Sequence, residues 1–116
     1  IVGDGGALMT GSELATAVAQ KAKIRVIVAN NQHYGTIRYH QEVHFPTRNH
    51  YATNLVNPNF AKYGESFGLK CFTINEVEEV IPTIQQAMEV DGPSLIEFKM
   101  SLELNTSTTT ISQLQT

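Results

Sequence analysis

The chain has 116 residues, of which 41% are hydrophobic and 16% are charged, and its formal net charge is −3. This size and composition are typical of one globular domain. The negative charge and the lack of a basic cluster argue against nucleic-acid binding, and no apolar run reaches the roughly 18 residues of a membrane helix. The single cysteine, Cys71, excludes an intrachain disulfide and suits a reducing compartment, so we expect a cytoplasmic protein.

The chain begins with a glycine-rich turn, Gly3–Gly6, and we expect Ile1–Val2 before it to be the end of a strand. A Gly-Asp-Gly sequence marks a place where the backbone takes unusual dihedral angles or comes close to a ligand. Thr10 and Glu13 have the spacing of a capping box, which predicts a helix from near Ser12. The apolar residues of this helix recur at helical spacing: Leu14, Ala15, Val18, Ala19 and Ala22.

The next element, Ile24–Ala29, is a short β-branched run typical of a buried strand, so that strand, helix and strand would form a βαβ unit. Parallel strands end at the same edge of a sheet, which would bring Asp4 and Asn31 together. Carboxylate and carboxamide oxygens are ligands for magnesium, and the N–H groups of Gly5 and Gly6 could reach a phosphate. These residues therefore predict a magnesium-diphosphate site.

Two other interpretations of these motifs are weaker. Asp4 and Asn30-Asn31 could each be turn formers, which would be the expected role of either motif taken alone. A dinucleotide-binding fingerprint requires glycine or alanine where this chain has Leu8, and the lysine of a Walker motif is absent.

The middle of the chain is expected to form a loop, Gln32–Thr36, and then a helical piece, Ile37–Phe45, which a proline ends. His40 and His44 are four residues apart, but the pattern is not that of a zinc protease helix. No third ligand is evident, so we expect no zinc between them. The polar stretch Thr47–Asn57 has no periodicity and is expected to be a loop over the carboxyl end of the sheet.

A further helix and strand are expected after this loop. The helix would begin at Asn57-Pro58, with proline near its first position, and would stop at Gly68. The strand that follows is Lys70–Ile74.

Another helix is predicted next, because Asn75 and Glu78 repeat the capping spacing. Pro82 predicts a kink, or a helix that begins properly near Ile81. This helix carries an apolar stripe that core packing explains better than a binding groove: Val77, Val80, Ile81, Ile84, Ala87 and Met88.

A turn at Asp91–Pro93 and a last strand, Ser94–Met100, complete the pattern. Strands that alternate with helices predict an α/β domain, a three-layer sandwich with a mainly parallel sheet of about four strands. We assign residues 1–104 to this domain. Residues 105–116 form a polar tail, which we expect to be mobile unless a partner holds it.

The spacing of the glycine and asparagine motifs resembles that of a known family. Gly3-Asp4-Gly5, then 24 residues, then Asn30-Asn31 are similar to the motif that binds thiamin diphosphate, which is also called thiamine pyrophosphate. The stretches NNQHYGTIRYHQE, NLVNPNFAKYGESFG and DGPSLIEF also resemble this family. They look like the C-terminal, diphosphate-binding domain of the acetolactate synthase and 2-oxo acid decarboxylase group, and the resemblance extends to about Met100.

The resemblance implies roles for particular residues. Magnesium would be held by the side chains of Asp4 and Asn31 and by the main-chain oxygen of His33, which lies two places after the second asparagine. The loop after the asparagines would add backbone contacts to the diphosphate. Together with the first glycines, the residues expected to bind thiamin diphosphate are Gly5, Gly6, Ala7, Asn31, His33, Tyr34, Gly35 and Thr36.

Two functions remain open at this point. In the resembled family each active site lies between this domain and a pyrimidine-binding domain, usually from a neighbouring subunit, which implies that partner, a homo-oligomer and a 2-oxo acid substrate. The chain would then be part of an acetolactate synthase-like or decarboxylase-like lyase or transferase. Alternatively it is a truncated, non-catalytic binding or assembly module that keeps the fold. Because it begins inside an expected strand, we expect an N-terminally truncated domain that is inactive when isolated.

Overall fold

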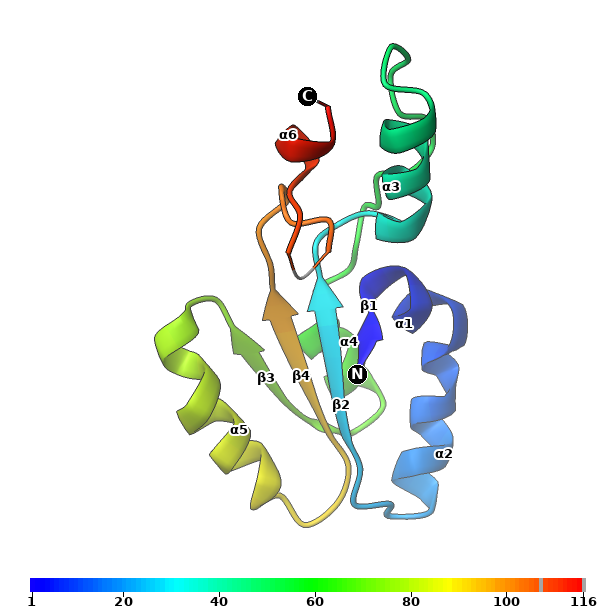
Figure 1. The fold of residues 1–116 in the computed structure, drawn as a ribbon. Helices are drawn as coiled ribbons and strands as arrows, with labels where there is room; N and C mark the ends of the chain where they lie inside the picture. Colours follow the sequence, from blue (N-terminus) through cyan, green and yellow to red (C-terminus); the bar gives the residue numbers. More distant parts are fainter. Residues whose placement is uncertain (107, 116) are drawn as a thin grey trace.

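A four-stranded parallel sheet forms the centre of the molecule (Figure 1). The computed structural model describes residues 1–106 and 108–115. In space the strands follow the order β1-β2-β4-β3, and each neighbouring pair is parallel. Their bounds are Val2–Gly3 for β1, Arg25–Asn30 for β2, Lys70–Ile74 for β3 and Ser94–Lys99 for β4.

Helices cover both faces of the sheet. The six α-helices are α1 (Asp4–Thr10), α2 (Leu14–Ala19), α3 (Gly35–His44), α4 (Phe60–Ser66), α5 (Val80–Met88) and α6 (Ile111–Leu114). Two short 3-10 turns, η1 (Gly11–Glu13) and η2 (Val77–Glu79), precede α2 and α5. None of the helices in the described residues has the length and hydropathy that a bilayer crossing requires.

The two faces of the sheet bury separate clusters of side chains. Val28 of β2 and Leu95 of β4 pack with residues of α1, α2 and α4 on one face. Ile96 of β4 and Ile74 of β3 pack with Ala87 of α5 on the other face. Successive strand residues point to opposite faces, so this alternation buries both sides of the sheet. The predicted three-layer α/β fold with a parallel sheet is thereby confirmed.

The first helix begins earlier than the sequence predicts. It starts at Asp4, directly after β1, and the expected capping box of Thr10 and Glu13 does not form. The start of this helix lies close to Tyr34, since a Cβ on Gly5 would lie 2.7 Å from the Tyr34 ring. The glycines that lower helix propensity are therefore the residues that let this helix lie close to its neighbours.

The apolar stripe of α5 is only partly used for core packing. Ala87 is fully buried and Val80 packs beside it, but Val77, Ile81 and Met88 are exposed. Core packing thus accounts for part of the stripe, because α5 packs on β3 and β4 and turns one side toward them (Figure 1).

The ends of α5 and α4 differ from the predictions by one or two residues. The capping box before α5 is formed by Glu76 and Glu79, not by Asn75 and Glu78. As one of the two alternatives predicted, the α-helix begins at Val80, so that Pro82 lies in its first turn. For α4, Asn59 is the N-cap, and Pro58 precedes the cap instead of occupying the first helical position.

The polar tail contains a short helix that the sequence did not predict. Thr110 and Gln113 form a capping box at the start of α6. Ile111 is buried, and the Glu103 carboxylate accepts a hydrogen bond of 2.7 Å from the Ser112 hydroxyl. These contacts place α6 beside α3, above the carboxyl ends of the strands (Figure 1).

The thiol of Cys71 on β3 is expected to react slowly with alkylating reagents. Burial, and then the carboxylate of Glu65, raise its pKa from 9.0 to about 11. At pH 8 this leaves about a hundredfold less thiolate than an unperturbed cysteine has, and the thiolate is the reactive form. The rate of reaction with iodoacetamide, compared between folded and urea-unfolded chain, measures this difference. Equal rates in both states would contradict it.

Candidate functional site

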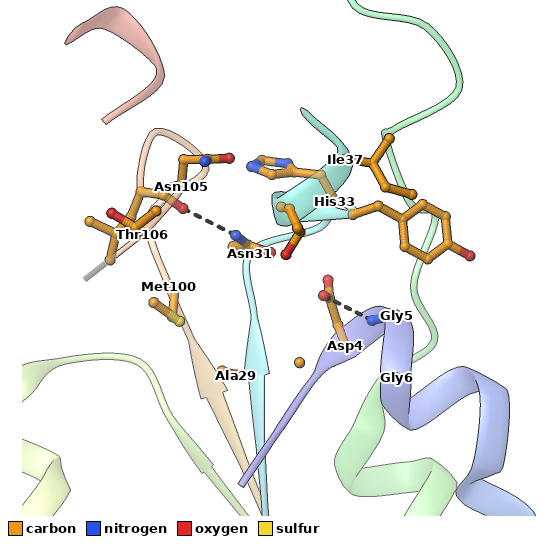
Figure 2. A pocket seen from close by; sticks show the side chains of 15 residues that line it. Asp4, Gly5, Gly6, Ala29, Asn31, His33, Ile37, Met100, Asn105 and Thr106 are labelled. Carbon is orange, nitrogen blue, oxygen red and sulfur yellow. Dashed lines mark hydrogen bonds between the residues drawn. The ribbon is translucent and has the colours of Figure 1, made fainter. Parts of the chain in front are cut away.

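A cavity of about 480 Å³ opens at the carboxyl ends of β1 and β2, where open α/β sheets bind ligands. Figure 2 shows it between the start of α1, the loop after β2 and the segment after β4. It is lined by Gly3, Asp4, Gly5, Gly6, Ala29, Asn31, His33, Tyr34, Gly35, Thr36, Ile37, Met100, Leu104, Asn105 and Thr106.

All the predicted site residues except Ala7 line this cavity. The parallel register pairs Gly3 with Ala29, which places Asp4 and Asn31 at one edge of the sheet. The side chain of Ala7 lies instead in the core between α1 and the sheet. The sequence thus predicted which residues meet at the cavity, and their roles toward a ligand remain predictions.

Asp4 is held in one orientation by three hydrogen bonds. Its side chain is 2% exposed. Oδ2 accepts from the backbone N–H of Gln32 at 2.8 Å and from Nδ2 of Asn57 at 2.7 Å, while Oδ1 accepts from the N–H of Gly5 at 3.0 Å. Because two donors occupy Oδ2, Oδ1 is the oxygen better able to bind a cation.

The backbone at Gln32 takes a left-handed conformation, with φ of 61°. Such a conformation costs a residue other than glycine on the order of 1 kcal/mol. It turns the chain directly after Asn31 and brings the Gln32 N–H to Asp4. The bond to a buried carboxylate compensates for the local cost.

Asn31 is oriented by the segment that follows β4. Its Nδ2 donates a hydrogen bond of 3.1 Å to the carbonyl of Leu104 (Figure 2). The amide nitrogen is therefore directed at Leu104, and Oδ1 is the atom that Asn31 can offer to a cation. The predicted domain ends at Leu104, and the predicted tail begins with Asn105 and Thr106. All three residues line one wall of the cavity.

His33 is buried beside the same cavity, with 5% of its surface exposed. Burial, and then the charge of Arg38, lower the pKa of its imidazole below the usual value of 6.5, which favours the neutral form. The adjacent backbone bonds use the carbonyl of Gln32 and the N–H of Tyr34. No backbone donor in residues 1–106 and 108–115 bonds to the main-chain oxygen of His33, the atom for which the sequence predicts a metal contact.

His40 and His44 lie on α3 with their rings stacked 5.7 Å apart. Glu42 between them is buried and forms an ion pair of 3.4 Å with Arg38. Within residues 1–106 and 108–115 there is no group of three or more histidine, cysteine and acidic side chains suited to a metal ion. The magnesium ligands that the sequence predicts are Asp4, an asparagine and a main-chain oxygen. They contain one acidic side chain, so they form a site of a different kind.

Three polar residues behind the cavity were not among the predicted site residues. Asn30, Asn57 and Glu97 connect to Asp4 by hydrogen bonds. Glu97 had a detectable signal, since it is a carboxylate within the apolar strand β4. Asn57 follows a polar loop and gave no such signal.

Asp4 is a buried carboxylate that forms no ion pair among the described residues. The ion pairs found there involve the carboxylates of Asp91 and Glu42 instead. Burying a carboxylate is costly unless it is paired or binds a metal. The residues at the cavity therefore fit a hard cation with oxygen ligands, of the kind that magnesium prefers.

Comparison with known proteins shows the family of this chain. Residues 1–98 match the family model of the thiamine pyrophosphate enzyme, C-terminal TPP binding domain. The chain is 34% identical over 103 residues to YdaP of Bacillus subtilis (strain 168), whose name describes it as thiamine pyrophosphate-containing. The aligned part covers 89% of this chain and 18% of YdaP.

Two further relatives carry the names of enzymes. An acetolactate synthase large subunit of Porphyra purpurea is 30% identical over 102 residues, which is 87% of this chain and 17% of the relative. A 3D-(3,5/4)-trihydroxycyclohexane-1,2-dione hydrolase of Bacillus subtilis (strain 168) is 35% identical over 106 residues, covering 86% and 16%. The chain thus spans 16 to 18% of the length of these three relatives.

Proposed function

The chain belongs to the thiamine pyrophosphate enzymes, as their C-terminal cofactor-binding domain, and from this premise we propose that it anchors the cofactor through magnesium. The ion is held by Asp4 Oδ1, Asn31 Oδ1 and the main-chain oxygen of His33. It binds the diphosphate of thiamin diphosphate in the cavity at the carboxyl end of β1 and β2.

The charge of the cavity carries this proposal. None of its fifteen described lining residues is lysine or arginine, and the one acidic residue among them is Asp4. A diphosphate placed there without a cation would face a buried carboxylate, which is electrostatically unfavourable. A magnesium ion between Asp4 and the phosphates reverses that interaction, and it is the expected partner of phosphate oxygens in such sites.

The start of α1 supports the same placement of the phosphates. The N–H of Gly5 donates to Oδ1 of Asp4, whereas the first N–H groups of a helix otherwise have no partner within it, and that of Gly6 belongs to a residue that lines the cavity. Tyr34, Gly35 and Thr36 line the opposite side, where α3 begins. The diphosphate would lie between the starts of two helices.

The reaction of the whole protein is proposed on the names of the relatives. We infer a lyase or transferase, as the name acetolactate synthase of one relative suggests, and a 2-oxo acid substrate, as the sequence resemblance implies. The cofactor supplies the carbanion chemistry when bound, while the residues of this chain bind and orient it. A pyrimidine-binding domain, from the same or a neighbouring subunit of a homo-oligomer, would supply the remaining wall of the active site.

Binding of thiamin diphosphate should depend on both the metal and Asn31. In calorimetric titrations, removal of magnesium with EDTA is expected to weaken binding by at least about tenfold, because the phosphates lose the cation that neutralises their charge. The change Asn31→Ala is expected to weaken binding by at least about tenfold as well, because the cation loses a ligand. Asn49→Ala, in an exposed loop, serves as the matched control. Equal affinity with magnesium and with EDTA would refute the proposed metal site.

A further inference from the structure

A chain of hydrogen bonds leads from the interior of the sheet to the cavity. Oε1 of Glu97 accepts from Nδ2 of Asn30 at 2.8 Å. Oδ1 of Asn30 accepts from Nδ2 of Asn57 at 2.8 Å and from the backbone N–H of Gln32 at 3.3 Å, and Nδ2 of Asn57 also donates to Oδ2 of Asp4 at 2.7 Å. We refer to Glu97, Asn30, Asn57 and Asp4 as the carboxylate relay.

Both ends of the relay are carboxylates, which only accept hydrogen bonds when ionised. Glu97 therefore requires the NH₂ group of Asn30, and the carbonyl of Asn30 must then point at Asn57. Asn57 in turn must direct its NH₂ group at both Asn30 and Asp4. If either asparagine were rotated by half a turn, two oxygens would face each other without a proton between them.

Glu97 itself does not touch the cavity. It is 1% exposed, on the face of β4 that packs toward α4, and it is not among the lining residues. Its Oε2 is buried without a hydrogen-bond partner in the described residues, so this carboxylate lowers the stability of the fold. An apolar residue of similar size would fill the same space at lower cost.

We propose that Glu97 is a positioning residue: through Asn30 and Asn57 it fixes the carboxylate of Asp4 in the orientation that binds the metal. This inference rests on the proposed magnesium site, and it assigns to Glu97 the task of setting the direction of the hydrogen bonds. Partners that lie behind metal ligands orient them in this way, and their loss typically lowers metal affinity about 10- to 100-fold.

The test distinguishes the effect of Glu97 on the direction of the hydrogen bonds from its effect on the stability of the fold. Glu97→Leu removes the acceptor, whereas Glu97→Gln keeps an oxygen that Asn30 can use. In Glu97→Leu we expect affinity for thiamin diphosphate with magnesium to fall about 10- to 100-fold, while the thermal midpoint stays the same or rises. Glu97→Gln should restore affinity close to that of the unsubstituted chain. Ser94→Ala, at a buried position on the same strand, is the control and should change neither quantity.

A second measurement needs no metal. In NMR spectra of the ligand-free chain, the Asn57 carboxamide protons should exchange slowly with solvent, and in Glu97→Leu they should exchange faster. If the unsubstituted chain binds no thiamin diphosphate, the proposed function fails, and the relay is judged on this exchange alone. Unchanged exchange in Glu97→Leu overturns the inference, and so does unchanged affinity where binding is measurable.

Asn57→Ala provides a second route should Glu97→Leu not fold. Asn57 is partly exposed, so its replacement perturbs the core less than a change at Glu97. It should lower affinity to a similar extent. Combined with Glu97→Leu, it should abolish the difference between glutamate and leucine at position 97, because the relay is already interrupted. An affinity in Asn57→Ala equal to that of the unsubstituted chain would overturn the inference.

Discussion

Replacement of Asp4 by asparagine is expected to weaken magnesium-dependent binding of thiamin diphosphate by at least about thirtyfold, since losing one partner of a buried charge contact costs roughly 2–5 kcal/mol. The change removes the one acidic side chain that lines the cavity. An asparagine oxygen can still accept from Gln32 and Asn57, so the hydrogen bonds that orient position 4 are largely kept.

Calorimetry at saturating magnesium measures this loss, and circular dichroism checks that Asp4→Asn stays folded. The matched control is Asp91→Asn, which removes an exposed carboxylate paired with Lys23 at 2.7 Å and far from the cavity. It should leave the affinity unchanged. An affinity in Asp4→Asn close to that of the control would mean that Asp4 holds no metal.

Replacement of Phe60 by alanine is expected to lower the free energy of unfolding by about 3–5 kcal/mol, the usual cost of deleting a fully buried phenylalanine. Phe60 is 0% exposed and is the first residue of α4. It packs in the cluster that joins α4 to β2 and β4. For a domain near 100 residues this corresponds to a fall in melting temperature of more than about 10 °C.

Urea unfolding followed by circular dichroism measures the effect of Phe60→Ala. Phe45→Ala removes the same side chain from a position that is 54% exposed, and it should cost less than about 0.5 kcal/mol. Phe60→Leu should recover most of the loss, because it refills the cavity. A cost below about 1 kcal/mol for Phe60→Ala would show that the core closes around the missing ring.

Much of the fold is predictable from local patterns. The strand Lys70–Ile74 has the bounds that its β-branched, apolar run predicts, and Gly68 before it has the positive φ of 94° that ends a helix. Asp4 and Asn31 meet because parallel strands end together, which follows from the order of the elements. These features follow from local sequence patterns and from the order of the elements along the chain.

The remaining features depend on contacts between distant residues. At the start of α1, Gly5 lies against the ring of Tyr34, and no local sequence pattern indicates that these two residues meet. The stripe on α5 shows that the helix is amphipathic, but not that its neighbours cover only one side. In the relay, Asn30 bonds to Glu97, which lies 67 positions further along the chain. Neither residue could therefore be assigned to the relay from spacing alone.

The position of β4 between β2 and β3 determines when the cofactor can bind during protein synthesis. β2 has neighbours on both sides only after β4, which is made last of the four strands, has inserted beside it. The carbonyl that orients Asn31 follows still later, at Leu104. Pairing over such long sequence separations is slow to form. A nascent chain that carries Asp4 and Asn31 but has not yet released β4 from the ribosome would therefore have both proposed ligands but an incomplete cofactor site.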